Sequence, residues 1–316
     1  MGQISRRGIM AGLAVAAVVP SAGSEALVQN SDRASLNIFA FRQVDVFSSE
    51  PFKGNPLAVV IGADALSVAQ MMRFSKWTNL SETAFLLRSA RDEADYRVRI
   101  FSLGAELPFA GHPTLGSCHA WLASGGKPKG AHIVQDCGIG LVRLRRDDGR
   151  LAFEAPPFRR SLPIDPATLD RIRRGLGLAE GEIKAARLLD GGLEQLAIMI
   201  DSRERLLALK PDWNILNADG VGLIAPWRAG GRKAGDPDFE VRVFDPTLVN
   251  AEDPVTGSFN ASVARWLIGA GMAPSHYVAS QGTAIGRAGL IHVDRDADGI
   301  WIGGDTADRI SGTVAF

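Results

Sequence analysis

The sequence predicts an α+β fold in which two similar lobes, each a mixed or antiparallel sheet with two helices, face each other across a cleft. An alternating strand pattern at 96–101, Tyr-Arg-Val-Arg-Ile-Phe, recurs at 239–244 as Phe-Glu-Val-Arg-Val-Phe. A helix-like stretch at 111–117 likewise has a partner at 252–258. The same order of patterns in both halves indicates a duplicated domain, and 316 residues are enough for two cores.

The elements of the first lobe follow from the spacing of apolar residues. Leu66, Ala69 and Met72 recur at helical spacing and predict a helix over 64–77. Within 79–87 a polar turn leads directly into an apolar strand. Further alternating or continuously apolar runs predict strands at 38–47, 57–61, 96–102, about 132–145 and 151–155.

A proline-rich segment separates the two halves. Pro156, Pro157 and Pro163 suit a linker, because proline lacks a backbone donor and interrupts regular structure. We therefore expect an N-terminal lobe at 37–160 and a C-terminal lobe at 161–316 that repeats the plan. The last strand is a candidate to cross back to the first lobe.

Composition and charge exclude several classes of function. Basic and acidic residues balance, with 35 of each, and no basic stripe stands out, so nucleic acid is not an expected partner. Cys118 and Cys137 fit no metal or redox motif, and no metal site is expected. Cys118 is interpreted as a small core residue, while a disulfide between the two cysteines is left open.

The first 26 residues have the pattern of a targeting segment. Ser-Arg-Arg-Gly-Ile-Met at 5–10 is a twin-arginine pattern, and a mild apolar run follows at 11–19. That run is too short and too rich in alanine to span a bilayer, so no stable membrane anchoring is expected. Cleavage is expected near Ala26, with Ala22 as the rival site, which predicts a periplasmic protein. The alternative is a frayed N-terminus on a cytoplasmic protein.

Two stretches carry the candidate chemistry: Gly-His-Pro-Thr-Leu-Gly-Ser at 111–117 and Glu-Asp-Pro-Val-Thr-Gly-Ser at 252–258. Proline favours the first turn of a helix, so each stretch predicts a helix immediately preceded by an acid–base residue, His112 or Asp253. Both Gly-Ser pairs are expected to expose N–H groups that hold a carboxylate or enolate oxygen. The alternative role of Asp253 is helix capping, and that of Ser258 is packing in the first turn.

Glu82 lies where a polar turn meets an apolar strand. A carboxylate at such a position is partly desolvated, which raises its pKa toward the range useful to a general base. The alternative is a solvated turn glutamate, and the second half has no acid in the matching place, where Asp219 is nearest. Asn55, between Gly54 and Pro56, fits a turn and is also a candidate to bind substrate.

The motifs, taken together, resemble those of the PhzF-like phenazine-biosynthesis family, in order and over nearly all of 38–316. No Gly-x-Ser-x-Gly elbow, phosphate loop or His-Glu-x-x-His zinc helix is present. The resemblance rests on Asp-Val-Phe at 45–47, Gly-Asn-Pro-Leu-Ala-Val-Val at 54–60, Asn-Leu-Ser-Glu-Thr-Ala-Phe at 79–85, Glu-Leu-Pro-Phe-Ala-Gly-His-Pro-Thr at 106–114 and the stretch at 252–258. The C-terminal signatures are Gln-Gly at 281–282, Gly-Arg at 286–287 and Trp-Ile-Gly-Gly at 301–304.

This resemblance implies a diaminopimelate-epimerase-like fold, in which each of two pseudo-symmetric lobes wraps a sheet around a central helix and the site lies between them. It implies isomerisation by a proton shift, without a metal or organic cofactor, in a homodimer. Matched by motif, Glu82 is the proton-shuttling acid/base. The residues implied to line the site, or to approach the substrate carboxylate or oxyanion through their backbone, are His112, Asp253, Ser258, Gly111 and Gly257.

Three functions are open at this point. The first is a cofactor-independent isomerase that moves a proton to an allylic position of a small unsaturated or hydroxylated carboxylic acid. The second is an epimerase that returns the proton to the opposite face of one carbon, although related epimerases use a pair of cysteines, and Cys118 and Cys137 lie elsewhere. The third is an exported small-molecule binder without turnover. An acid–base set directed at one cleft favours the isomerase.

Overall fold

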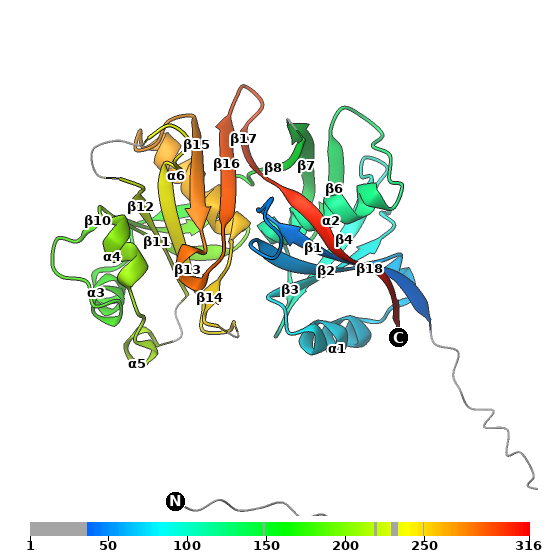
Figure 1. Ribbon diagram of the computed structural model, residues 1–316, viewed down its shortest axis with the longest axis horizontal. Helices are drawn as coiled ribbons and strands as arrows, with labels where there is room; N and C mark the ends of the chain where they lie inside the picture. Colours follow the sequence, from blue (N-terminus) through cyan, green and yellow to red (C-terminus); the bar gives the residue numbers. More distant parts are fainter. Residues whose placement is uncertain (1–36, 148, 218–219, 229–232, 249) are drawn as a thin grey trace, which may run out of the picture. The chain divides into compact units, whose positions relative to one another are not determined.

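The first half of the chain folds as a sheet around one helix (Figure 1). The computed structural model describes residues 37–147, 149–217, 220–228, 233–248 and 250–316, and the twin-arginine segment expected at 1–26 lies outside them. The strands of this first lobe, the last of them from the C-terminus, are β1 (Ile38–Val46), β2 (Asn55–Ile61), β3 (Glu82–Leu87), β4 (Tyr96–Ser102), β5 (Glu106–Leu107), β6 (Ile133–Cys137), β7 (Gly140–Asp147), β8 (Arg150–Glu154) and β18 (Thr306–Ala315). Its helical segments are the short 3-10 helix η1 (Ala63–Ala65), α1 (Val68–Thr78) and the central α2 (Gly111–Ala123).

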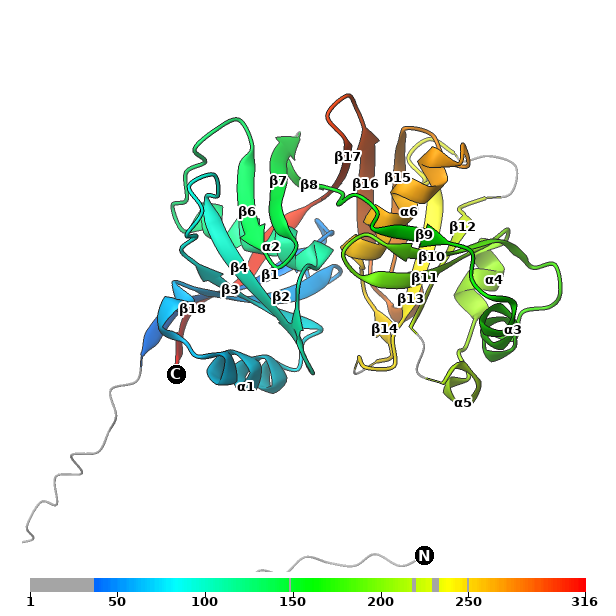
Figure 2. The same ribbon diagram turned by 180° about the vertical axis from the view of Figure 1, so that it is seen from behind.

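The second lobe repeats this plan around helix α6 (Gly257–Gly269), as the view from behind also shows (Figure 2). Its strands are β9 (Arg160–Leu162), β10 (Ile183–Asp190), β11 (Glu194–Ile200), β12 (Val221–Pro226), β13 (Phe239–Phe244), β14 (Glu252–Asp253), β15 (His276–Gln281), β16 (Gly289–Arg295) and β17 (Ile300–Gly304). Its other helical segments are α3 (Pro166–Gly175), α4 (Arg203–Ala208), α5 (Trp213–Leu216) and η2 (Thr283–Ile285).

Strand pairing follows the same order in the two lobes. In the first, β2 and β3 are parallel, β3 and β4 antiparallel, and β4 and β6 parallel, with β7 and β8 following. In the second, β11, β12, β13, β15, β16 and β17 repeat these directions. β8 pairs with β17, so one sheet passes through both lobes, and β18 pairs with β1. The predicted α+β fold of two pseudo-symmetric lobes is confirmed.

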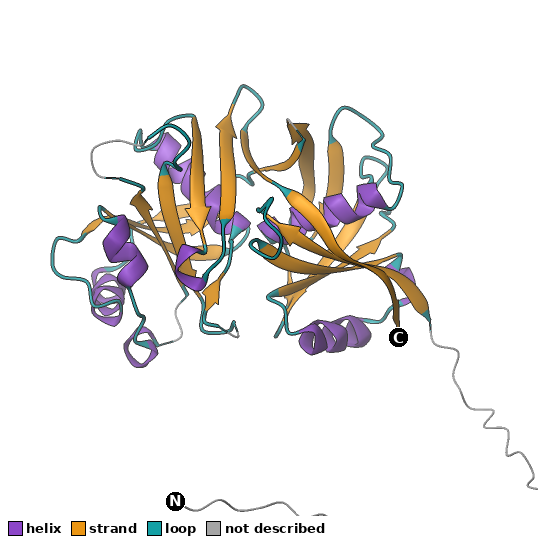
Figure 3. Cartoon of the chain, in the orientation of Figure 1, coloured by secondary structure: helices purple, strands orange, loops and turns teal. Residues whose placement is uncertain are grey.

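Helices α2 and α6 are buried on nearly all sides. Small and apolar residues cover most of their circumference rather than a single stripe, which is the pattern of a helix enclosed by other elements. Figure 3 shows both helices among the strands, with α1, α3, α4 and α5 on the outer faces of the lobes. Leu115 of α2 and Phe259 of α6 belong to the same apolar core. Both central helices therefore contribute to one core.

Local boundaries differ from the predicted ones for identifiable reasons. Ser67 and Gln70 form a capping box, so α1 starts after Ser67 and the earlier part of the predicted helix forms η1. The strand predicted at about 132–145 is the hairpin of β6 and β7, because Gly140 adopts a φ of 107°, which favours glycine. The segment expected to be a linker contains β9, which pairs with β10.

Two kinds of feature are absent from the described part of the chain. None of its helices combines the length and the apolar character needed to cross a bilayer. Its His, Cys, Asp and Glu side chains form no group of three or more that could hold a metal ion. Cys118 and Cys137 are both free and buried, so the disulfide that the sequence left open is not formed.

Candidate active site

The internal repeat matches the two lobes in a register that differs from the one inferred from the sequence. Glu106 of β5 lies opposite Phe101, and Glu252 of β14 lies opposite Phe244, so these two short strands are equivalent. The guanidinium of Arg99 donates two hydrogen bonds, of 2.7 and 2.5 Å, to the carboxylate of Glu106. Arg242 donates two hydrogen bonds to the carboxylate of Glu252 in the same way, at 3.0 and 2.7 Å.

This register corrects the expected helix starts. His112 is the second residue of α2, not the residue before it, and Asp253 belongs to β14, ahead of α6. His112 is therefore equivalent to Ser258, and Leu107 is equivalent to Asp253. The Gly116-Ser117 pair lies inside α2, with Gly116 packed against core side chains, and provides no helix start.

Gly111 and Gly257 bring the N-termini of α2 and α6 into backbone contact. A Cβ atom on Gly111 would lie 2.4 Å from the carbonyl carbon of Gly257 and 2.5 Å from the backbone nitrogen of Ser258. Neither helix has a side-chain cap, whereas a serine or aspartate side chain caps each of α1, α3, α4 and α5. The first-turn N–H groups of α2 and α6 lack intrahelical acceptors and carry the positive ends of both helix dipoles.

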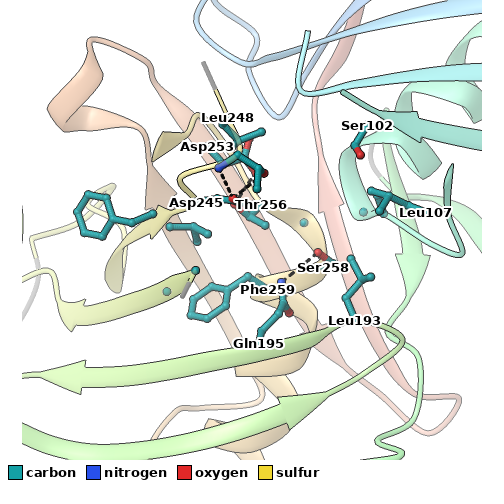
Figure 4. A pocket seen from close by; sticks show the side chains of 18 of the residues that line it. Ser102, Leu107, Leu193, Gln195, Asp245, Leu248, Asp253, Thr256, Ser258 and Phe259 are labelled. Atoms are coloured by element: carbon teal, nitrogen blue, oxygen red, sulfur yellow. Dashed lines mark hydrogen bonds between the residues drawn. The ribbon is translucent and has the colours of Figure 1, made fainter. Parts of the chain in front are cut away.

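A cavity of about 300 Å³ lies where these helices begin. This volume is at the lower end of the range for small-molecule sites. Of the predicted site residues, those that line the cavity are Glu82, Gly111, His112, Asp253, Gly257 and Ser258. Figure 4 shows the second-lobe wall, where a hydrogen bond joins Gln195 to Ser258. The described lining contains four carboxylates, with Glu194 and Asp245 as the other two, and no lysine or arginine.

Glu82 is the first residue of β3 and presents its carboxyl group to the cavity. Burial, together with the charges of Asp253 and Asp245, raises its pKa well above the ordinary value of 4.5. Its Oε2 atom is buried without a hydrogen-bond partner and lies 3.5 Å from Nε2 of His112. The carboxyl group therefore holds a proton strongly and is a strong base once it is ionised.

His112 is neutral in this site. Burial lowers its pKa to about 3, because a buried imidazolium would lose its hydration. Its Nδ1 atom lies 3.2 Å from the side-chain nitrogen of Asn55, and its Nε2 atom faces Glu82. A neutral ring in this position can donate or accept a hydrogen bond next to the reacting carboxyl group.

Asp253 differs from Glu82 in its hydrogen bonds. Its Oδ1 accepts from Asn55 at 2.8 Å and its Oδ2 accepts from the hydroxyl of Thr256 at 2.6 Å. Burial nevertheless raises its pKa to about 6, and the two hydrogen bonds hold it from rising further. Gln281, part of a C-terminal signature, supports this turn by donating to the carbonyl of Asp253 at 3.1 Å.

Three residues that sequence reasoning did not single out complete the site. Asp245 follows β13 and lines the cavity, with its Oδ1 accepting from the backbone and hydroxyl of Thr247 at 2.9 and 2.7 Å. Gln195 lies 3.4 Å from the hydroxyl of Ser258, and Thr256 orients the carboxylate described above. An acid directly after a buried strand is the one local signal that marks Asp245. Asn55 is buried behind the cavity and is absent from its lining.

Residues 44–314 match the family model described as phenazine biosynthesis-like protein, PhzC-PhzF. A fission-yeast protein, antisense-enhancing sequence 1 of Schizosaccharomyces pombe, is 34% identical over 86% of this chain and 97% of its own length. The trans-2,3-dihydro-3-hydroxyanthranilate isomerase of Pseudomonas aeruginosa is 34% identical over 68% of this chain and 74% of its own length.

Solved structures agree with these sequence matches. A PhzF-family phenazine biosynthesis protein of Enterococcus faecalis, 25% identical, superposes with a TM-score of 0.70 over 88% of this chain and 99% of its own. A hydroxyproline epimerase of Agrobacterium vitis, 13% identical, shares the fold with a TM-score of 0.54 over 88% and 92%. The predicted fold class and isomerase activity are thereby confirmed. The chain belongs to the PhzC-PhzF family of phenazine biosynthesis-like proteins.

Proposed function

We propose that the chain shifts a proton within a small unsaturated or hydroxylated carboxylic acid by acid–base catalysis, with Glu82 as the proton carrier. The observation that supports this role is the buried carboxyl group of Glu82, which has an unpartnered oxygen, a raised pKa and a position on the cavity wall. A carboxyl group in such surroundings both takes and returns a proton readily.

The substrate carboxylate would be held by the backbone amides at the starts of α2 and α6. Gly111 and Gly257 allow the two helix starts to approach closely, and both helices lack a side-chain cap. Helix N-termini bind anions through free N–H groups and the dipole, which suits a cavity without a described lysine or arginine in its wall. Ser258 adds a hydroxyl group at the same place.

The proposed reaction conserves all its protons and electrons. Ionised Glu82 takes a proton from a carbon next to the unsaturated system, and the electron pair of that C–H bond becomes a new π bond. The far carbon of the former π bond, one allylic position away, then takes a proton from Glu82, and that proton is a deuteron when the carboxyl group exchanges with deuterated water between the two steps. His112, neutral and 3.5 Å from Glu82, stabilises the charge that develops, and Asp253 orients the substrate beside it.

The test uses the full chain and its Glu82→Gln variant in deuterated water, with Glu93→Gln as the matched control at an exposed glutamate. Each protein is incubated with a panel of hydroxylated, unsaturated carboxylic acids that includes the dihydro-hydroxyanthranilate. Carbon-bound deuterium formed by the wild type and by Glu93→Gln, and not by Glu82→Gln, is the expected result. Full exchange by Glu82→Gln would refute Glu82 as the base. If all three proteins bind the acids and none exchanges protons, the result would favour a binder without turnover. The rate should rise with pH as Glu82 ionises.

We also propose export through the twin-arginine segment and assembly as a homodimer. The pattern at Arg6-Arg7 supports the first proposal, and the family resemblance supports the second. Changing both arginines to lysine should retain the full chain in the cytoplasmic fraction, whereas the wild type should reach the periplasm. Periplasmic recovery of the double variant would contradict the first proposal. A monomer mass in light scattering would contradict the second.

A further inference from the structure

We infer that Asn55 is a positioning residue that acts across the two lobes, where it fixes the ring tautomer of His112 and the hydrogen bonding of Asp253. Asn55 is the first residue of β2 in the first lobe, and 0% of its surface is exposed. Asn55 does not line the cavity, so its side chain hydrogen-bonds the residues that do and does not make the substrate contact expected from the sequence.

The side-chain nitrogen of Asn55 carries two hydrogens and lies close to two oxygen atoms and one ring nitrogen. It lies 2.8 Å from Oδ1 of Asp253, 2.9 Å from the carbonyl oxygen of Val255 and 3.2 Å from Nδ1 of His112. The opposite orientation of the amide would place its oxygen against a carboxylate and a carbonyl oxygen, which repel it. The hydrogen-bond network therefore assigns the nitrogen to this side.

This assignment determines where His112 carries its proton. A protonated Nδ1 would direct one N–H group at another, so Nδ1 must present its lone pair to Asn55. The neutral ring then has its single hydrogen on Nε2, the atom that lies 3.5 Å from Oε2 of Glu82. His112 is thus oriented as a donor toward Glu82, and Asn55 imposes that direction from the far side of the ring.

The same amide helps to distinguish the two carboxyl groups. Both oxygens of Asp253 accept a hydrogen bond, one from Asn55 and one from Thr256, while Oε2 of Glu82 accepts none. Donors stabilise an ionised carboxylate, so the negative charge is favoured on Asp253 and the proton on Glu82. Without Asn55 this separation of roles would weaken.

Asn55 also joins the lobes at the site. Its own strand and His112 belong to the first lobe, whereas Asp253 and Val255 belong to the second. The second lobe supplies the two oxygen atoms that orient the amide of Asn55. Asn55 can therefore set the tautomer of His112, in the first lobe, only when the second lobe is in place. This role rests on the proposed function for its use in catalysis, but the tautomer itself is a property of the resting protein.

The test is nitrogen NMR of the full chain labelled with ring-¹⁵N histidine, which needs no substrate. The chain has five histidines, and the signals of His112 are identified by their loss in His112→Gln. We expect a hydrogen on Nε2 and a bare Nδ1 in the wild type. Asn55→Asp should move the hydrogen to Nδ1, Asn55→Leu should populate both tautomers, and the exposed control Asn214→Asp should change nothing.

A wild-type hydrogen on Nδ1 would overturn the inference by itself, so the test holds even where a variant fails to fold. An unchanged tautomer in folded Asn55→Asp would overturn it as well. Because neither result depends on turnover, they are distinguishable from a failure of the proposed isomerase. With a substrate in hand, Asn55→Leu should lower kcat by about 100-fold with little change in KM. A KM effect alone would show a substrate contact instead.

Discussion

Replacement of Asp253 by asparagine should stabilise the protein at neutral pH while impairing the site. Asp253 is buried, and the protein raises its pKa from 3.8 to about 6. Asparagine has the same shape and no charge, and it can still accept from Asn55 through its oxygen. The substitution therefore removes the cost of ionising a buried carboxyl group and leaves its packing in place.

The sign and size of the effect follow from the two pKa values. Between about pH 4 and pH 6 the native state holds a proton that the unfolded chain has released, so stability falls as pH rises through this range. The difference of about two pH units corresponds to about 3 kcal/mol in the free energy of unfolding. Asp253→Asn should match the wild type near about pH 4 and exceed it by about 3 kcal/mol above about pH 7.

Urea denaturation of the full chain at a series of pH values measures this difference. Asp92→Asn, at an exposed position, is the matched control and should show no such trend. Removing the charge of Asp253 should also lower the pKa of Glu82, because that charge helps to raise it. A stability difference that does not change with pH, or that decreases as pH rises, would refute the assignment of Asp253 as a buried group ionised at a cost.

Three further comparisons test the architecture, two by urea denaturation of paired variants and one by thiol labelling. Gly111→Ala places a Cβ atom against the backbone of Gly257, so it should lower the free energy of unfolding by about 3 kcal/mol and remove most of the activity. A Cβ atom on the control Gly104 meets nothing within 4 Å, so equal effects of the two substitutions would contradict this reasoning. Arg242→Met leaves the buried carboxylate of Glu252 without its ion-pair partner and should lower the free energy of unfolding by about 3–5 kcal/mol. Arg99→Met, at the equivalent but more exposed pair, should cost about 1 kcal/mol or less, and similar losses would argue against the burial difference. Burial raises the pKa of Cys118 to about 12, so this thiol should resist labelling until the protein unfolds, and rapid labelling of native protein would refute it.

The sequence predicted elements well where alternation and turns coincided. The strand expected at 96–102 is β4, with the same limits. The hairpin within 132–145 was missed because its alternation continues through the turn, and only the left-handed conformation of Gly140 marks the reversal. Periodicity describes which residues are buried and carries little information about where a strand turns back.

The register of the repeat was wrong because proline has more than one permitted context. Pro113 lies in the first turn of α2, as the helix-start rule predicts, but Pro254 follows a short strand and precedes α6. The structural register instead aligns Glu106 with Glu252 through their matching arginine pairs. Those pairs depend on cross-strand neighbours, which a comparison of short motifs does not detect.

The candidate site was predicted where motifs and chemistry agreed, and incompletely where contacts cross the lobes. Glu82, His112 and Asp253 line one cavity, as expected from the resemblance. Gln195 comes from a segment whose local sequence has no distinguishing motif, and Asp245 is marked only by its place directly after a buried strand. Their importance arises only from the fold, which places them opposite side chains distant in the sequence.

The distribution of acid–base groups between the lobes favours a proton shift over inversion at one carbon. Glu82 and Gly220 are equivalent, as are Leu107 and Asp253, so neither carboxyl group has an acidic counterpart in the other lobe. Inversion needs separate bases on opposite faces of a carbon, whereas Glu82 is the one carboxyl group in the described lining that faces neutral His112. A single carrier should return the proton to the face from which it was taken. Deuterium in the product, located by proton NMR coupling constants, should lie on that face, and delivery to the opposite face would require a second base.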